Sequence, residues 1–476
     1  MEPLIFLVSA GIASYVVLDR AKKPQKKNEL NPKFGYPIRS LFPTNFKAPM
    51  VEQSDSSLVC TTHLNHGSYG VAPFDVSKAQ RKHSEMVERW PDDFFRRKAL
   101  PLYTKTANIA ASFIGAPEGS VVFVENATTG VNAVLSSLQL TKNDAILVNN
   151  HTYNACKNTA RHICERFGAT LIVQDITLPL PETDDGIVAD FEAYLDANAA
   201  LTNAPQIKFA LIDHITSPTA IVMPVERLSA ACRKRGILVM IDGAHAPGML
   251  DLKISIDCPS CDWYTGNLHK WVYTPKGVAV LYTRKDKQDM TSAAVISHFY
   301  KKSYIERFYM IGTNDQSRLL ATPDALKFID DRLGGLAAMR EYNTNLINLG
   351  VEILCQAWNV QRMYPKEKSC PFLAVVECPL DWKRWVRTLE GNELPLDVSD
   401  IEAEVALAQD EGFNERVACA ILFSFGIQTV FFTWKVGGKM KMWNRTSAQV
   451  YNVREDYEDL ARAVITLGKQ TKSLKE

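Results

Sequence analysis

The sequence predicts an α/β fold with a largely parallel sheet, followed by a smaller α+β domain. From about Thr61 onward, short apolar runs alternate with amphipathic helical stretches, as in chains of repeated strand–helix units. The runs are almost continuously apolar, which is expected of strands covered by helices on both faces. At 476 residues the chain is also too long for one compact core.

Six apolar runs are the expected strands of the large domain. They cover residues 121–124, 145–148, 171–173, 209–212, 237–241 and 278–282. Each is short and lies between stretches with helical periodicity. Together they predict the sheet on which a site would be built.

The chain is expected to divide into four parts, the first of which is a possible membrane anchor at residues 1–20. Residues 21–60 contain several prolines and read as a linker or arm. Residues 61–325 form the large domain, with the N-terminal segment contributing to the small domain, and residues 326–476 form the small domain. A long helical stretch after Pro323 is expected to cross between the domains. The small domain is expected to contain strands at 372–376, 417–425 and 429–434.

The N-terminus carries an uncharged apolar run at residues 4–18, followed by basic residues from Arg20 onward. This pattern predicts a membrane anchor within residues 1–20, with a cytoplasmic catalytic domain after it. The run is shorter than the ~20 residues of a comfortable span, so a buried or interfacial helix is the alternative. Only Glu2 precedes the run, which disfavours a cleaved signal peptide.

Composition and cysteine spacing argue against nucleic acid and a metal ion as partners. The formal charge of +1 gives no overall field for nucleic acid. The ten cysteines are scattered, which favours free thiols in a reducing compartment. Cys258 and Cys261 form the one close pair, and no second pair or histidine pair completes a metal shell. No metal is therefore expected, and two ordinary thiols in a turn are the simpler reading.

Asp242 directly follows a strongly apolar strand, at the carboxyl end where open α/β sheets bind ligands. A carboxylate there can pair with a protonated pyridine nitrogen. Lys270 lies before the next strand, between His269 and Trp271, in surroundings apolar for an idle lysine. Its amine could bind a cofactor aldehyde and act as a base.

A third segment places a strand before residues 126–130 (NATTG) and an apolar helix after them. Free backbone N–H groups and the hydroxyls of Thr128 and Thr129 would gather at the helix N-terminus. Such a terminus can bind an anion, although an ordinary threonine cap is the plain alternative.

In this order the three segments resemble the class-V aminotransferase family, in particular isopenicillin N epimerase-like proteins and the C–S lyase of ergothioneine synthesis. The resemblance runs from about Thr61 to the C-terminus, through HLNHGSYG (63–70), PDDFFRR (91–97), NATTGVNAVL (126–135), YNACKNT (153–159), DGAHAPG (242–248), NLHKWVYTPKG (267–277), IGTND (311–315) and RTSAQVYN (445–452). It implies pyridoxal 5′-phosphate (PLP) as cofactor. It also implies fold type I of PLP-dependent transferases, with a mainly parallel seven-stranded sheet.

The resemblance implies a role for each matching residue. Lys270 corresponds to the lysine that holds PLP as a Schiff base, Asp242 to the partner of the pyridinium, and His245 to the contact of the ring oxygen. Tyr153 corresponds to the ring stacked on the pyridine, with a buried core tyrosine as the alternative. The residues that correspond to the phosphate shell are Thr128, Thr129, Asn267 and His269.

Further residues concern the substrate and the partner subunit. Arg445 corresponds to the arginine that binds the substrate carboxylate, a role that suits a planar guanidinium. A structural arginine paired with Asp456 or Glu455 is the alternative. Gly312 and Thr313 correspond to a pair that reaches the neighbouring subunit's phosphate, which implies a homodimer with shared active sites. The pocket mouth is assigned to Asn65, His66 and Tyr69.

The reaction stays open among several outcomes, because loss of a Cα proton can lead to elimination, epimerisation or transamination. Cys370 and Cys378 lie beside an apolar strand rather than in a convincing loop, which disfavours persulfide chemistry. A lyase acting on a cysteine-derived amino acid, by C–S or other β-elimination with Lys270 as base, is the leading expectation. An epimerase or aminotransferase is the enzymatic alternative. A membrane-tethered PLP-binding scaffold is the non-enzymatic one, which the intact Lys270, Asp242 and Arg445 argue against.

Overall fold

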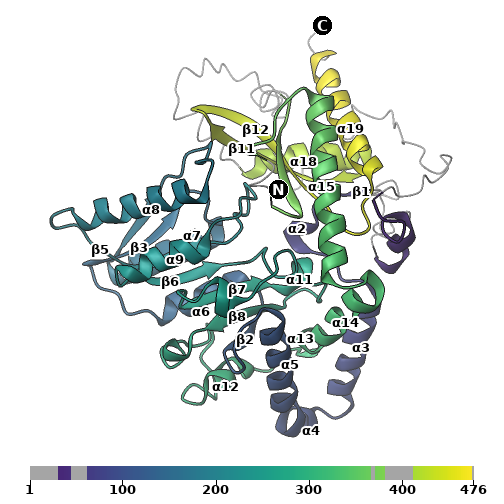
Figure 1. The fold of residues 1–476 in the computed structure, drawn as a ribbon. Coiled ribbons are helices and arrows are strands. Elements are labelled where there is room, and N and C mark those ends of the chain that lie inside the picture. Colours follow the sequence, from purple (N-terminus) through teal and green to yellow (C-terminus); the bar gives the residue numbers. More distant parts are fainter. Residues whose placement is uncertain (1–29, 44–61, 366–369, 381–410, 474–476) are drawn as a thin grey trace, which may run out of the picture. The chain divides into compact units, whose positions relative to one another are not determined.

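The computed structural model describes residues 30–43, 62–365, 370–380 and 411–473 (Figure 1). It separates into a larger unit, Gly67–Arg340 with Lys366–Pro371, and a smaller unit, Met1–His66, Glu341–Pro365 and Phe372–Glu476. The expected anchor at residues 1–20 lies outside the described residues, as does most of the linker. Within the described ranges, no helix is long and apolar enough to cross a membrane.

The larger unit is built on a seven-stranded sheet. Its strands lie in the order β2-β8-β7-β6-β5-β3-β4, and only β8 runs antiparallel to its neighbours. The strands are β2 (Val121–Val124), β3 (Asp144–Asn149), β4 (Thr170–Gln174), β5 (Gln206–Asp213), β6 (Leu238–Asp242), β7 (Trp263–Asn267) and β8 (Ala279–Thr283). The prediction of a mainly parallel sheet is confirmed.

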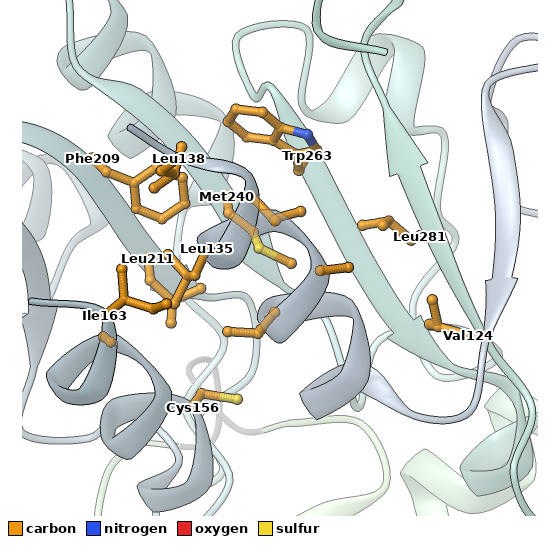
Figure 2. Packing of buried hydrophobic residues seen from close by; sticks show 14 of the residues in the cluster. Val124, Leu135, Leu138, Cys156, Ile163, Phe209, Leu211, Met240, Trp263 and Leu281 are labelled. Atoms are coloured by element: carbon orange, nitrogen blue, oxygen red, sulfur yellow. The ribbon is translucent and has the colours of Figure 1, made fainter. Parts of the chain in front are cut away.

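Side chains on both faces of this sheet are buried, which explains why its strands read as continuous apolar runs. In β5, Phe209 and Leu211 pack on one face, while Ala210 and Ile212 are buried on the other. Figure 2 shows the first face, where residues of the strands pack against α6 (Ala127–Ser137) and α7 (Asn154–Phe167). The face toward α6 and α7 is therefore formed by buried apolar side chains.

The remaining helices of the larger unit connect and cover the strands. They are α3 (Phe74–Arg89), α4 (Pro91–Asp93), the π-helical turn η3 (Phe94–Lys98), α5 (Ala99–Phe113), α8 (Asp184–Ala199), α9 (Val225–Lys234), α10 (Ile254–Asp257), α11 (Leu268–Trp271), η4 (Lys285–Lys287), α12 (Tyr304–Tyr309), α13 (Ser317–Leu320) and α14 (Thr322–Leu333). Two of the boundaries between the units fall inside helices, in α2 (His66–Tyr69) and α15 (Leu336–Trp358).

The smaller unit contains a three-stranded antiparallel sheet, in the order β11-β12-β9, and a parallel pair, β1 with β10. Its elements are the 3₁₀ helix η2 (Tyr36–Leu41), β1 (Thr62–His63), β9 (Leu373–Glu377), α18 (Glu411–Phe425), β10 (Ile427–Gln428), β11 (Val430–Val436), β12 (Lys439–Ser447) and α19 (Arg454–Ser473). The apolar runs at 372–376 and 429–434 do form strands.

The strand expected at residues 417–425 is wrong, because these residues belong to α18. Val417 and Ile421 are fully buried and lie four residues apart, on one face of the helix. A continuous apolar run of this length fits a buried helix as well as a buried strand, and periodicity alone does not separate them.

Candidate active site

Lys270 lies in α11, a single helical turn that directly follows β7. Its ammonium nitrogen is 3.1 Å from Nε2 of His245, which follows β6 by three residues. The two side chains therefore come from neighbouring strand ends, at the edge where parallel strands present ligand-binding residues. Lys270 is half-buried, and the amine and the imidazole form one hydrogen-bonded pair.

Asp242 ends β6 and is almost completely buried. One carboxylate oxygen accepts a hydrogen bond from the Ala244 amide at 3.0 Å, and the other from the Cys156 thiol at 3.3 Å. Burial raises the pKa of Asp242, while these two donors and the charge of Lys270 oppose the rise. Asp242 and Lys270 are thus electrostatically coupled in the structure.

Cys156 is a contact of Asp242 that the sequence did not single out. It lies in the first turn of α7, is fully buried, and also shares a hydrogen bond with the side chain of Thr128. Burial and the neighbouring charges of Asp242 and Asp213 raise the pKa of the thiol well above its ordinary value. Its segment, YNACKNT, is part of the family resemblance, but the neighbouring residues in the sequence do not indicate a role for Cys156.

The start of α6 is a helix N-terminus capped by an asparagine side chain. Asn126 caps the helix by accepting from the Thr129 amide at 2.9 Å and from its hydroxyl at 3.2 Å. The Ala127 amide donates to Oδ1 of Asn267 at 2.9 Å. Asn267 therefore ties the end of β7 to the start of α6, and Thr128 lies in the same turn.

His269 is buried beside Lys270, and its Nδ1 is 2.9 Å from the Val278 carbonyl. Burial is the main cause that lowers its pKa, to about 4, and the charges of Lys270 and Lys276 contribute. The imidazole is therefore neutral near pH 7, with Nδ1 as the donor to the carbonyl. Its Nε2 is left as an acceptor.

The segment around Tyr69 approaches α11 closely through a glycine. Gly70 has φ of +69°, and a Cβ there would lie 1.8 Å from the His269 carbonyl oxygen. Lys276 donates to the Gly70 carbonyl at 2.7 Å. Only glycine permits this approach. Tyr69 next to it is 72% exposed.

Tyr153 is the N-cap residue of α7, and its side chain is 48% exposed. The alternative reading, a buried core tyrosine, is therefore wrong. Its backbone amide donates to Asp213, which lies beside Asp242 at the end of β5. The helix start that holds Tyr153 is thus fixed to the strand ends.

Three of the predicted substrate residues belong to the smaller unit. Arg445 lies in β12, is 6% exposed, and donates to Oδ1 of Asn65 at 3.4 Å. His66 donates through its amide to Ser447 at 2.9 Å, and its Nδ1 is 2.8 Å from the Tyr451 hydroxyl. The structure therefore gathers Arg445, Asn65 and His66 around the end of β12.

Asp456, one suggested structural partner of Arg445, is bonded to another arginine. Both of its carboxylate oxygens accept from Arg39, at 2.9 and 3.0 Å. Asn452 and the Val453 amide donate to the same carboxylate. The Asp456 carboxylate is thus already well supplied with donors, which weakens the structural reading of Arg445.

Gly312 and Thr313 lie in the loop between α12 and α13, and Gly312 has φ of +121°. In the described part of this single chain, no hydrogen bond joins either residue to the other predicted cofactor residues. The structure does not bring them together with Lys270 and Asp242 by such contacts.

The four cysteines discussed above as candidates are buried thiols. Cys378 directly follows β9 and is buried, which raises the pKa of its thiol to about 12. Cys370 is fully buried next to the sulfur of Met249. Cys258 and Cys261 are buried free thiols, and no metal-binding cluster occurs among the described residues.

These side chains fit a PLP group by the chemistry of the donors. Lys270 offers an amine for the aldehyde, Asp242 a buried carboxylate for the ring nitrogen, and the start of α6 offers N–H and hydroxyl donors for the phosphate. Asp213 adds a buried oxygen, Oδ2, that has no hydrogen-bond partner in the described structure.

Comparison with known proteins agrees with this fit. A protein of Oryza sativa subsp. japonica, provisionally named L-cysteine desulfhydrase 1, is 31% identical over 422 residues, covering 84% of this chain and 82% of its own. Isopenicillin N epimerase of Amycolatopsis lactamdurans is 29% identical over 287 residues, or 56% of this chain and 69% of the epimerase.

Among solved structures, the cystine C–S lyase C-DES, in complex with its product cysteine persulfide, aligns with a TM-score of 0.60. The identity is 18%, with 85% of this chain and 97% of that chain covered. The fold is therefore fold type I of PLP-dependent enzymes. The family profile described as Aminotransferase class-V matches residues 87–391, more than half of the sequence. The chain belongs to the class-V aminotransferase family of PLP-dependent enzymes.

Proposed function

We propose that the protein is a PLP-dependent lyase that eliminates the β-substituent, most simply sulfur, from a cysteine-derived amino acid. The observation that carries this proposal is the Lys270–His245 pair, an amine and an imidazole 3.1 Å apart at the ends of β7 and β6. Elimination needs one group that removes the Cα proton, and this pair supplies it at one place.

Each of the site residues in the larger unit has a separate proposed role. PLP, when bound, stabilises the electron pair left at Cα after its proton is removed. Lys270 holds the cofactor and then moves the Cα proton, with His245 as its hydrogen-bond partner. Asp242 keeps the ring nitrogen protonated, because a nearby anion favours the charged form of that nitrogen. Thr128, Thr129, Asn267 and His269 bind the phosphate, and Tyr153 covers the ring.

The lyase reading is preferred to a desulfurase that transfers sulfur through its own cysteine. Such chemistry needs a thiolate that can reach the substrate. Cys370 and Cys378 are both buried, and the raised pKa of Cys378 keeps that thiol protonated. Sulfur released from the substrate would then leave as a small molecule.

The lyase reading is also preferred to an epimerase. Epimerisation requires a proton to be delivered to the face of Cα opposite to the one it left, so it requires a second, separate acid. Elimination requires a base at Cα, and the Lys270–His245 pair is placed to supply it. The desulfhydrase relative also covers much more of the chain than the epimerase does, 84% against 56%.

Arg445 is proposed to bind the substrate carboxylate, and Asn65, His66 and Tyr69 to line the mouth of the pocket. Support comes from the burial of Arg445 and from its contact with Asn65. A guanidinium donates two parallel hydrogen bonds to a carboxylate, which selects α-amino acids over amines.

The test is a substrate panel given to the purified, PLP-loaded protein. L-Cysteine, L-cystine and S-alkyl cysteines are expected to yield pyruvate and ammonia together with sulfide, a persulfide or a thiol. Formation of the D-amino acid without keto acid would support the epimerase instead. A keto acid formed only when an amino acceptor is added would support transamination. Absence of any amino-acid-dependent spectral change would favour the scaffold.

Two further proposals concern assembly and location. We propose a homodimer in which Gly312 and Thr313 contact the phosphate bound by the other subunit. The exposed side chains of Val295, Ile296 and Tyr300 in the preceding segment support an interface there.

We also propose that the apolar run at residues 4–18 associates with a membrane. Extraction of the full-length protein with alkaline carbonate tests this, and release into the supernatant would exclude a spanning anchor.

A further inference from the structure

Asp213 and Asp242 form a pair of buried carboxylates at the ends of adjacent strands. Asp213 ends β5, Asp242 ends β6, and the two residues are register partners in the parallel sheet. Asp213 is two residues beyond Leu211, and Asp242 is two residues beyond Met240. Leu211 and Met240 belong to the cluster that packs against α6 and α7 (Figure 2). Since side chains alternate along a strand, both carboxylates lie on this same face.

The surroundings of the two carboxylates are dry. Asp213 is 2% exposed and Asp242 is 3% exposed. Neighbouring strands are about 4.8 Å apart, so register partners at the strand ends lie close together. Two negative charges at such separation repel much more strongly in the interior than in water. Burial and this repulsion therefore favour a proton on one of the two carboxylates.

The hydrogen bonds indicate which carboxylate keeps the proton. Asp242 has the Ala244 amide, the Cys156 thiol and the charge of Lys270 to stabilise its ionised form. Asp213 accepts from the Thr152 side chain and the Tyr153 amide, and its Oδ2 has no partner among the described residues. An oxygen without a donor is the natural place for a proton in a buried acid.

The other titratable groups around the pair lie on α7, β7 and α11, and on the residue that follows β5. On α7, Cys156 is kept neutral by burial, and Lys157 is a half-buried cation that favours ionised Asp213. On β7, burial raises the pKa of Tyr264 well above its ordinary value, and on α11 Lys270 acts on Asp242. His214, directly after Asp213, is neutral because burial lowers its pKa to about 4. Two cations, Lys157 and Lys270, therefore act on the pair.

We propose that Asp213 is a positioning residue that holds a proton and so leaves Asp242 as the single ionised carboxylate of the pair. The proposal rests on the proposed contact of Asp242 with the pyridine nitrogen. One negative charge then meets the one positive charge of the ring nitrogen. A second ionised carboxylate would lie buried beside the first, and the repulsion between the two charges would weaken the folded state.

The first experiment looks for the proton by infrared spectroscopy of the full-length, PLP-loaded protein at pH 7. The wild type is expected to show the C=O stretching band of a protonated carboxylic acid, and D213N is expected to lack it. D190N, which changes an exposed aspartate of α8, is expected to keep the band. A D213N spectrum identical to that of the wild type in this region would overturn the proposal.

The second measurement is urea unfolding of the same proteins between pH 5 and pH 8. Burial and the charge of Asp242 raise the pKa of Asp213 well above its ordinary value, so folded protein holds a proton that unfolded protein has lost. The contribution of Asp213 to the free energy of unfolding is complete at low pH, and it is lost as the pH rises through the pKa of Asp213 in the folded protein. The wild-type unfolding constant should rise by up to about tenfold per pH unit relative to D213N, whose amide mimics the protonated acid.

D213A distinguishes a structural role from the proton. It removes the proton and the hydrogen bonds together, so it should be less stable than D213N at every pH. Parallel pH profiles of D213N and the wild type would contradict proton holding.

If D213N does not fold, D242N provides the answer. Removal of the neighbouring charge should shift the loss of the Asp213 acid band to lower pH, and an unchanged titration would overturn the proposal. D242N also tests the underlying assignment separately. If it keeps wild-type PLP affinity and activity, the pyridine contact is wrong, whereas the infrared band reports on Asp213 alone.

Discussion

The Cys156 thiol donates to Oδ2 of Asp242 across 3.3 Å, and so connects α7 to the end of β6. The thiol remains protonated because burial and the nearby carboxylates raise its pKa well above the ordinary value. Its side-chain contact with Thr128 extends the connection to the first turn of α6. The proposed partners of the ring nitrogen and of the phosphate are therefore joined through one sulfur atom.

Replacement of Cys156 by alanine is expected to weaken PLP binding. The change removes a donor from the ionised carboxylate, so the pKa of Asp242 rises and its attraction for the ring nitrogen falls. A hydrogen bond of this kind contributes about 1 kcal/mol, or about fivefold in the dissociation constant of PLP. Cys156→Ser should keep the affinity, because a hydroxyl is the stronger donor. Cys164→Ala, a buried cysteine further along α7, is the control, and an equal loss there would make the effect one of packing.

Replacement of Lys270 by alanine should abolish the PLP that borohydride reduction fixes to the chain. Mass spectrometry of the reduced protein measures this directly, since the attached cofactor adds its mass to one peptide. Lys301→Ala, an exposed lysine of the same unit, should keep the label. Covalent cofactor in the Lys270 variant would place the attachment elsewhere.

Replacement of Arg445 by alanine should lower kcat/KM by at least ~10-fold, because two charge-assisted hydrogen bonds to the substrate carboxylate are lost. The absorbance of the resting enzyme should stay unchanged. Arg39→Ala is the matched variant, since Arg39 forms an ion pair with the buried Asp456. It should lower the melting temperature, by an amount equivalent to about 3 kcal/mol, without changing substrate titration. An Arg445 variant that behaves like the Arg39 variant would remove Arg445 from the site.

Mixing two inactive variants tests the shared active site. Lys270→Ala and a Gly312→Val/Thr313→Ala double variant are each expected to be inactive or poorly loaded with PLP. In a mixed dimer, one site combines both defects and the other contains none. Unfolding and refolding the two together should restore about a quarter of the wild-type activity. No recovery, with dimers confirmed by sedimentation, would mean that each site uses residues of one chain.

The pH dependence of stability should reveal a buried neutral histidine. Burial lowers the pKa of His214 to about 4, and its Nδ1 is 2.8 Å from the Tyr264 hydroxyl. Because the unfolded chain binds a proton near pH 6.5 and the folded chain does not, stability falls as pH decreases from about 6.5 to about 4. Between pH 7 and pH 4.5, the free energy of unfolding of His214→Gln should fall by about 2 kcal/mol less than that of the wild type. Equal losses, measured by urea unfolding, would contradict the assignment.

Much of the large sheet could be predicted from the sequence, because strands buried on both faces are marked by apolar residues alone. β7 escaped this criterion, since Thr265 and Gly266 interrupt it and its neighbours β6 and β8 complete its hydrogen bonds. The strand predicted at residues 417–425 is wrong because the run is apolar throughout. Such a run shows neither the period of a helix nor that of a strand.

The candidate site shows the same contrast. Asp242 and Lys270 could be found because each stands next to a strand in the sequence. Asp213 carries the same mark as Asp242, since it directly follows the predicted strand 209–212, but its significance depends on the register of β5 with β6. Cys156 carries no local mark, because the contact with Asp242 spans 86 residues of sequence.

The bond from the Ala127 amide to Asn267 has a consequence for how this protein can diverge. Asn267 is three residues before Lys270, so the same short turn fixes the start of α6 and presents the reactive amine. If these residues have the proposed roles, a mutation in this turn is expected to change cofactor retention and reactivity together. New substrate preferences should therefore arise in the smaller unit, around Asn65 and Arg445. In a mutational library, residues 267–270 are expected to be the least tolerant positions of the larger unit.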